Sequence, residues 1–198
     1  MATALLVIDA QKIYTDPESE MHCADAKMTL NRINQLISFF ESRGEPVFLI
    51  RHIHKADGSD LGRLFDFSGD AEEEFNFVEG TEAVEYSEGL KRPVHAHELV
   101  KNRYSAFAGT KLHDQLRKLG IDRVVICGFM TNFCCESTAR SAHDLDFYVD
   151  FVLDATGTPG TDHMDEKEIR KVVGELLGAG FACVVSTKEY ADRKPERR

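Results

Sequence analysis

Strand-length apolar runs alternate with helical patterns along most of the chain, and this alternation limits the fold more than any other feature. "TALLVID" (3–9) and "DRVVICGF" (122–129) are continuous apolar runs, typical of strands buried on both faces. Apolar residues recur at helical spacing over 25–43, and Gly44 ends that pattern. Strands that alternate with helices favour an α/β fold, in which a parallel sheet carries helices on both faces.

Over the whole chain, these patterns predict six strands and four helices. The length suits a single domain, residues 1–198. Residues 53–97 show no clean period, and we expect this irregular segment to form a pocket wall, an oligomer contact or both. The predicted strands are 3–9, 46–52, 98–102, 122–129, 147–155 and 181–187, and the predicted helices are 25–43, 111–120, 132–145 and 165–178.

Composition excludes several classes of partner. The net charge is −10, and the one basic cluster is the tail "DRKPERR", so we expect no nucleic-acid or membrane partner. The N-terminal run lacks the features of a signal peptide, and no apolar stretch approaches the roughly 18 residues of a membrane span. Five cysteines at irregular spacing indicate neither a disulfide framework nor a zinc site, which favours a reducing cytoplasm.

Three chemically active side chains stand where predicted strands end. Ligands of open parallel sheets bind beyond the carboxyl ends of the strands, so side chains at these positions are candidates for the functional site. Asp9 ends the first strand, Lys101 ends the third, and the fourth runs through a turn into Cys134 and Cys135. Each has an ordinary structural role as an alternative: a turn cap, a solvated lysine and packing residues. Together they suit a nucleophilic thiol, with a cation to stabilise the thiolate and a carboxylate to move its proton.

Helix phase distinguishes the two cysteines. Cys135 shares a face with Ala139 and Ala142, which suits close packing on a sheet. Cys134 lies on the side of Thr138 and Ser141, in the first turn, where unpaired backbone N–H groups can hold an oxyanion. The phase therefore favours Cys134 as the nucleophile and Cys135 as a core residue.

These segments resemble the isochorismatase-like cysteine hydrolases, a family that includes nicotinamidases and N-carbamoylsarcosine amidase. "ALLVIDAQ" looks like the strand with the catalytic aspartate, and "ELVKNRYSAFAGTKL" looks like the lysine segment. "VVICGFMTNFCCESTARSAHDLDFYV" looks like the nucleophile segment, and its register puts the family cysteine on Cys134 and the usual valine on Cys135. The resemblance covers nearly the whole chain, with the three motifs in family order.

The resemblance implies a three-layer α/β/α Rossmann-like domain with a six-stranded parallel sheet, and a homo-oligomer, either dimer or tetramer. It also implies a cis peptide bond between Phe129 and Met130. The backbone N–H groups of Met130 and Cys134 would then form the oxyanion hole. Nicotinamidases bind a metal through an Asp-x-His pair and a second His after strand two. Here His52, His54 and Asp60 have similar spacing with the residue types exchanged, so we expect no metal or other cofactor and keep these three as an alternative metal site.

The sequence thus predicts a hydrolase that cleaves an amide or ureido C–N bond of a small molecule through a thioester, with catalytic Asp9, Lys101 and Cys134. Isochorismatases proper lack the nucleophilic cysteine, so its presence here argues against hydrolysis of a vinyl ether. That reaction is kept as an alternative function, as is a non-catalytic relative that binds a small molecule. The candidate substrate-binding residues near the strand ends are Tyr14, His52, His54, Tyr104, Phe107 and Phe133, together with Phe129 and Met130.

Overall fold

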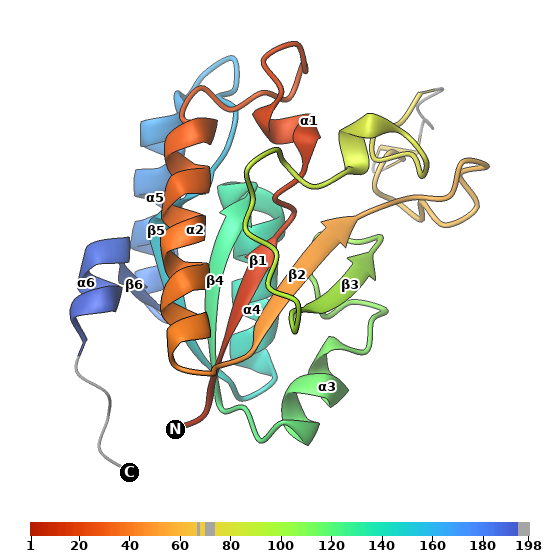
Figure 1. The fold of residues 1–198 in the computed structure, drawn as a ribbon. Helices are drawn as coiled ribbons and strands as arrows, with labels where there is room; N and C mark the ends of the chain where they lie inside the picture. Colours follow the sequence, from red (N-terminus) through yellow and green to blue (C-terminus); the bar gives the residue numbers. More distant parts are fainter. Residues whose placement is uncertain (67, 70–73, 194–198) are drawn as a thin grey trace.

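A computed structural model describes residues 1–66, 68–69 and 74–193 of the chain (Figure 1). Its centre is a six-stranded sheet in the order β3-β2-β1-β4-β5-β6, in which every neighbouring pair is parallel. This arrangement confirms the predicted α/β fold. The strands are β1 (Thr3–Ile8), β2 (Val47–His52), β3 (His97–Lys101), β4 (Arg123–Phe129), β5 (Tyr148–Gly157) and β6 (Cys183–Val185).

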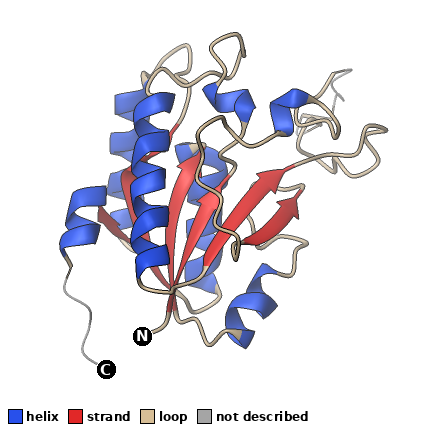
Figure 2. Cartoon of the chain, viewed as in Figure 1, coloured by secondary structure: helices blue, strands red, loops and turns tan. Residues whose placement is uncertain are grey.

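Helices cover both faces of the sheet and complete the three layers (Figure 2). One face carries α2 (Ala26–Ser42) and α6 (Thr187–Asp192). The other face carries α3 (Leu112–Lys118), α4 (Glu136–Asp144) and α5 (Glu166–Gly178). The shorter elements are α1 (Lys12–Thr15), the 3-10 turn η1 (Glu82–Val84) and the π-helical turn η2 (Thr131–Cys135).

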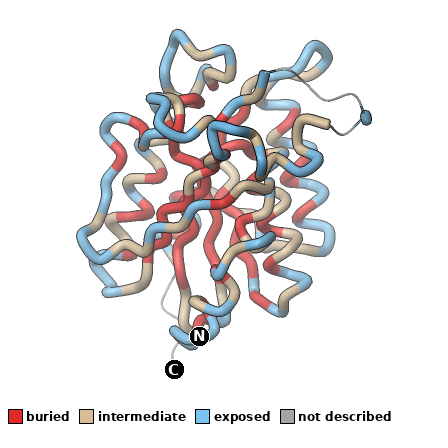
Figure 3. The backbone as a smooth tube through the Cα atoms, turned by 90° about the vertical axis from the view of Figure 1, so that its right-hand side faces the viewer, coloured by how far each residue is buried: buried red, intermediate tan, exposed pale blue. Residues whose placement is uncertain are grey.

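Buried residues are concentrated along the central strands (Figure 3). Their apolar side chains form two layers, one on each face of the sheet. Alternate residues of β1 show the reason, since successive side chains of a strand point to opposite faces. Leu5 and Val7 pack toward α2, whereas Leu6 and Ile8 pack toward α3, α4 and α5. A strand that is buried on both faces needs the continuous apolar run seen in the sequence.

Gly128 permits a close approach between β1 and β4 at their carboxyl ends. Its φ of +122° is a backbone conformation that favours glycine, and a Cβ here would lie 1.9 Å from the Ile8 carbonyl oxygen. Ile8 and Gly128 are paired in the sheet. The residues that follow the two strands, Asp9 and the turn η2, are therefore held side by side.

The structure departs from the predicted elements in several places. The expected helix over 132–145 is a π-helical turn followed by α4, and β6 has three residues instead of the seven expected over 181–187. The helices α1 and α6 were not predicted. Among the helices of the described part of the chain, none is long and apolar enough to cross a membrane.

The irregular segment 53–97 returns to the end of β2 after its excursion from the sheet. The N–H of His54 donates to the Phe77 carbonyl at 2.7 Å, and the N–H of Glu79 donates to the His54 carbonyl at 2.8 Å. Residues 67 and 70–73 of the segment lie outside the described residues. Phe77 and Glu79 of this segment therefore lie beside His54.

Candidate active site

The three side chains predicted at strand ends come together in the structure. Asp9 follows β1 with a φ of 46°, Lys101 is the last residue of β3, and Cys134 lies in η2, after β4. The Lys101 ammonium nitrogen lies 2.8 Å from Asp9 Oδ2 and donates to Cys134 Sγ at 3.3 Å. Its third contact is the Arg103 carbonyl oxygen at 3.0 Å. One cation therefore contacts both the carboxylate and the thiol.

Burial controls the protonation of this group, since Asp9 is fully buried and Lys101 and Cys134 are each 2% exposed. Burial raises the pKa of the Cys134 thiol to about 12, although the Lys101 charge acts in the opposite direction. Burial likewise raises the pKa of Asp9 against the effect of Lys101. Lys101 favours the thiolate, as the sequence predicts for a neighbouring cation, but the desolvation cost of the thiolate exceeds that stabilisation. The resting thiol is therefore protonated.

The turn η2 separates the two cysteines as helix phase predicts. The N–H of Cys135 donates to the Met130 carbonyl at 3.0 Å, five residues earlier, which is the hydrogen bond of a π-helical turn. Cys135 is fully buried among apolar side chains such as Ala139 and Ala142. Cys134 instead carries the contact with Lys101. The bond between Phe129 and Met130, just before the turn, is a cis peptide.

Hydrogen bonds from α4 fix the loop that follows Lys101. The Thr138 hydroxyl donates to the Cys134 carbonyl at 2.6 Å and accepts from the N–H of Ala106 at 3.0 Å. Ser141 and Ser105 form a second link through their hydroxyl groups, 2.8 Å apart. These are the two α4 residues that helix phase placed on the Cys134 side, and they tie the lysine segment to the cysteine segment.

Aromatic rings line the other side of the site. Tyr14 is 1% exposed and stacks on Phe129 with ring centroids 5.4 Å apart. Burial is the main cause that raises the pKa of Tyr14, and the nearby Cys134 and Asp9 raise it further. Phe77 stacks on His52 with ring centroids 4.4 Å apart, and it lies 6.1 Å from Tyr14. Sequence reasoning missed Phe77 as a site residue because its segment has no regular period.

Gln11 is a second residue that sequence reasoning missed. Its buried side-chain amide accepts from the His52 N–H at 2.8 Å and donates to the carbonyls of His52 and Val84, at 3.0 and 2.9 Å. The side chain thus ties the end of β2 to the turn η1. Its position two residues after Asp9 was the available signal, because it lies in the same strand-end segment.

His52 and His54 form a buried pair beside the three central side chains. One ring nitrogen of His52 lies within 4.8 Å of an Asp9 carboxylate oxygen and of Cys134 Sγ. The Nε2 atoms of His52 and His54 are 3.0 Å apart, and His54 Nδ1 lies 3.4 Å from Asp60 Oδ1. Burial lowers the pKa of both histidines, so both imidazoles are neutral.

The geometry does not suit a metal ion bound by His52, His54 and Asp60, the alternative metal site. His54 lies between the other two groups, with Nε2 toward His52 and Nδ1 toward Asp60, so the three donors do not converge on one point. Asp9, His52 and Cys134 do converge, but the Lys101 ammonium already contacts two of them and would repel a cation. No step of the proposed reaction is therefore assigned to a metal.

The remaining predicted pocket residues divide into two groups. Tyr104 and Phe133 are each 38% exposed and lie 5.2 Å apart, at the surface beside Cys134. Phe107 was predicted to line the pocket, but it packs against Phe147 at 5.9 Å, just before β5 begins. That contact belongs to the amino ends of the strands, so Phe107 is not brought to the site.

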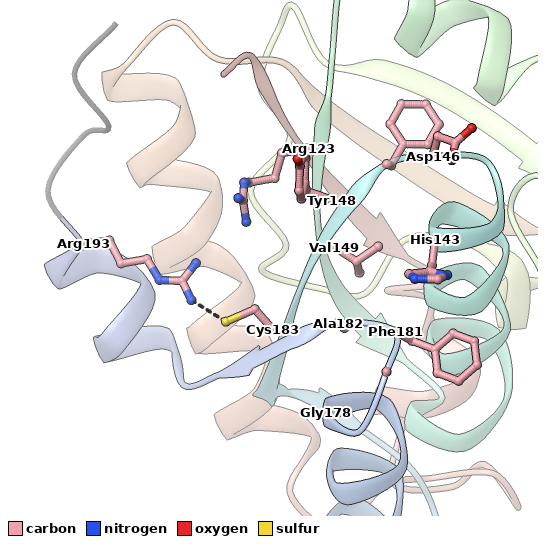
Figure 4. Close-up of a pocket in the computed structure, with 12 residues that line it drawn as sticks. Arg123, His143, Asp146, Tyr148, Val149, Gly178, Phe181, Ala182, Cys183 and Arg193 are labelled. Atoms are coloured by element: carbon pink, nitrogen blue, oxygen red, sulfur yellow. Dashed lines mark hydrogen bonds between the residues drawn. The ribbon is translucent and has the colours of Figure 1, made fainter.

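A cavity of about 910 Å³ lies at the amino ends of the strands, away from these residues (Figure 4). Arg123, Tyr148 and Cys183, which begin β4, β5 and β6, contribute to its lining. The Arg193 guanidinium donates to Cys183 Sγ at 3.0 Å across it. Because ligands of such sheets bind at the carboxyl ends, the buried side chains at the other end are the candidate active site.

Comparisons with known proteins agree with this fold. The isochorismatase domain model matches residues 3–189. Nicotinamidase 3 of Arabidopsis thaliana is 36% identical over 185 residues, which cover 92% of this chain and 83% of that protein. The crystal structure of a cysteine hydrolase from Pseudomonas syringae superposes with a TM-score of 0.87 at 26% identity, over 96% of this chain and 90% of that one.

N-carbamoylsarcosine amidase from Thermoplasma acidophilum has the same fold, with a TM-score of 0.76 at 22% identity over 99% of this chain and all of that one. The domain match spans most of the chain, and the plant relative is similar over most of its length. The chain belongs to the isochorismatase family of hydrolases.

Proposed function

We propose that this protein is a cysteine-dependent hydrolase that cleaves the C–N bond of a small amide or ureide. The observation that carries the proposal is the contact of one buried ammonium, that of Lys101, with both Asp9 and Cys134. An isochorismatase-type ether hydrolysis would not need a thiol in this contact. The amidases among the compared proteins support a carbonyl substrate.

In the proposed first step, Asp9 takes the thiol proton while Cys134 Sγ attacks the carbonyl carbon. A carbon–sulfur bond forms, and the carbonyl electron pair moves to the oxygen, which accepts hydrogen bonds from the backbone N–H groups of Met130 and Cys134. Protonated Asp9 then gives its proton to the nitrogen, the C–N bond breaks, and ammonia or an amine leaves. Because burial raises the pKa of Asp9, its acid form is able to deliver this proton.

Water completes the reaction by attacking the thioester. Asp9 accepts a proton from the water, the carbon–sulfur bond breaks, and Sγ recovers a proton from Asp9. Lys101 stabilises the negative charge on whichever of Asp9 and Cys134 carries it, since its ammonium contacts both. The products are a carboxylic or carbamic acid and the released amine, and the enzyme returns to its starting protonation state.

A matched pair of variants, Cys134→Ala and Cys135→Ala, tests the proposal. Primary amides and ureides are screened for ammonia release, and the acyl-enzyme is sought by mass spectrometry. Cys134→Ala is expected to abolish turnover and acylation, whereas Cys135→Ala keeps both because its side chain lies in the apolar core. Turnover by Cys134→Ala, or ether cleavage without a covalent intermediate, would exclude this mechanism.

A further inference from the structure

The buried chain from Asp60 through His54 to His52 ends at the catalytic group, and the proposed mechanism does not use it. His52 is 1% exposed and His54 is fully buried, whereas the Asp60 side chain is 18% exposed. The chain therefore runs from the edge of the protein to within 4.8 Å of Asp9 and Cys134. Two buried imidazoles in such a place call for a reason.

Asp60 determines the direction of the hydrogen bonds. Its carboxylate accepts from the N–H of Lys55 at 3.0 Å and from Asn102 Nδ2 at 3.1 Å, and both partners are donors. Asp60 is therefore an acceptor throughout. His54 Nδ1 lies 3.4 Å from Oδ1, an electrostatic contact that is too long for a well-formed hydrogen bond. We infer that this nitrogen carries the proton, because a bare lone pair there would face the negative charge.

The positions of the remaining protons on His54 and His52 follow because both rings are neutral. With its proton on Nδ1, His54 has a bare Nε2, which accepts from the Nε2–H of His52 across 3.0 Å. The Nδ1 of His52 is then a bare acceptor. The nearby Asp9 carboxylate does not reverse this direction, because the Lys101 ammonium lies 2.8 Å from it and balances its charge. Among the described residues the buried Nδ1 of His52 has no hydrogen-bond partner, and the three protons of Lys101 already reach Asp9, Cys134 and the Arg103 carbonyl.

We propose that His52 is a specificity-determining residue whose Nδ1 accepts a hydrogen bond from an N–H on the leaving nitrogen of the substrate. The inference rests on the proposed function and adds the substrate class to it. The leaving nitrogen must lie next to Asp9, which protonates it. One ring nitrogen of His52 lies within 4.8 Å of an Asp9 carboxylate oxygen, and since Nε2 is paired with His54 we infer that this nitrogen is Nδ1. Two groups this close can both contact one nitrogen atom, since a hydrogen bond spans about 3 Å.

The hydrogen-bond direction selects among acyl compounds. A primary amide, a secondary amide or a ureide presents an N–H to His52. An ester presents an oxygen lone pair to the same bare nitrogen, and a fully substituted amide presents an alkyl group. Either one leaves a buried acceptor without a donor, which costs binding in the transition state. The proposed substrates are therefore compounds whose scissile nitrogen carries at least one hydrogen.

The first test measures the tautomers without any substrate, by ¹⁵N–¹H correlation spectra of the full chain labelled at histidine. Spectra of His52→Gln and His54→Gln assign the signals. We expect the proton of His54 on Nδ1 and that of His52 on Nε2. The opposite tautomer of His52, a charged ring, or joint binding of one equivalent of Zn²⁺ by both Nε2 atoms would overturn the proposal. This result is independent of whether the protein hydrolyses amides.

The second test compares amides with esters of the same acyl group, using the best amide from the screen and its methyl ester. In His52→Phe, which keeps a ring against Phe77, the ratio of kcat/KM for amide over ester is expected to fall by about tenfold to a hundredfold. Asp60→Asn, at the partly exposed end, should lower the ratio by a smaller factor. The control is Asp57→Asn, which removes a neighbouring carboxylate that accepts a hydrogen bond from the Ser59 N–H. This substitution should leave the ratio unchanged.

An unchanged ratio in both His52→Phe and Asp60→Asn would refute the role of His52 while amide hydrolysis stands. Turnover of esters with no turnover of any N–H amide would refute it as well. If no acyl compound is turned over, the proposed function fails, and the tautomer spectra alone decide whether the chain has the direction inferred for it.

Discussion

Removal of one member of the buried Asp9–Lys101 pair should destabilise the protein more than removal of both. The two charged groups are 2.8 Å apart, and neither side chain is exposed. At an effective dielectric constant of about 20, two unit charges at that distance interact by about 6 kcal/mol. Measured costs of breaking a buried pair are about 3–5 kcal/mol, because the remaining charge stays buried without a partner. We expect Lys101→Met to lose about that much.

The double variant Asp9→Asn/Lys101→Met removes both charges and should recover most of this loss, although it has no activity. The assay is urea unfolding of the wild type, the two single variants and the double variant, analysed as a cycle. We expect a coupling of about 3 kcal/mol. The exposed pair Lys12–Glu82, 3.1 Å apart, is a matched control for which no coupling should be measurable.

The pH dependence of the stability of Lys101→Met provides an independent test. In Lys101→Met, burial raises the pKa of Asp9 without an opposing charge, so the folded protein holds a proton that the unfolded chain releases. Stability then falls as pH rises above the ordinary range of a carboxyl group. Lys101→Met should therefore be closer to wild type at pH 5 than at pH 8. If the single losses add up in the double variant, or if Lys101→Met is as stable as wild type at pH 8, the reasoning is wrong.

Two further perturbations test the fold and the thiol. Gly128→Ala places a Cβ 1.9 Å from the Ile8 carbonyl oxygen at a φ of +122°, so it should destabilise the protein by more than about 4 kcal/mol, measured by urea unfolding or seen as loss of folded protein. Burial raises the pKa of Cys134 from 9.0 to about 12, so the folded state keeps a proton that the unfolded chain loses in this range. Stability should fall with rising pH there, by about 1.4 kcal/mol per pH unit for this one thiol, and Cys134→Ala should show a correspondingly smaller slope.

The sheet could be predicted because its strands are buried on both faces and must be apolar throughout. The predicted ends of β1 and β4 differ from the observed ends by one residue. The edge strand β6 was predicted too long because its residues are only partly buried, which leaves its sequence less constrained. The helix α6 had a readable signal, since Ser186 and Glu189 form a capping box.

The three central residues could be predicted because parallel strands deliver their ends to one edge of the sheet. The protonation states of these residues could not be predicted, because a sequence shows which residues can carry a charge but not how deeply they are buried. The wall formed by Phe77 was missed for a related reason. Its segment has no period of its own and takes its conformation from contacts with His52 and His54. Phe107 was misplaced because a loop residue can turn toward either end of the sheet.

The burial of the three central groups is consistent with the reaction proposed for them. An exposed thiolate beside a lysine would be the ordinary way to activate a cysteine, yet here burial raises the pKa of both Asp9 and Cys134. When the proton moves from Sγ to the carboxylate, the negative charge moves from oxygen to sulfur. Lys101 contacts both atoms, at 2.8 and 3.3 Å, so the charge moves within reach of the same cation and little has to reorganise. In the proposed mechanism, burial therefore disfavours the thiolate at rest, and the fixed ammonium keeps the charged state accessible once a carbonyl is in place.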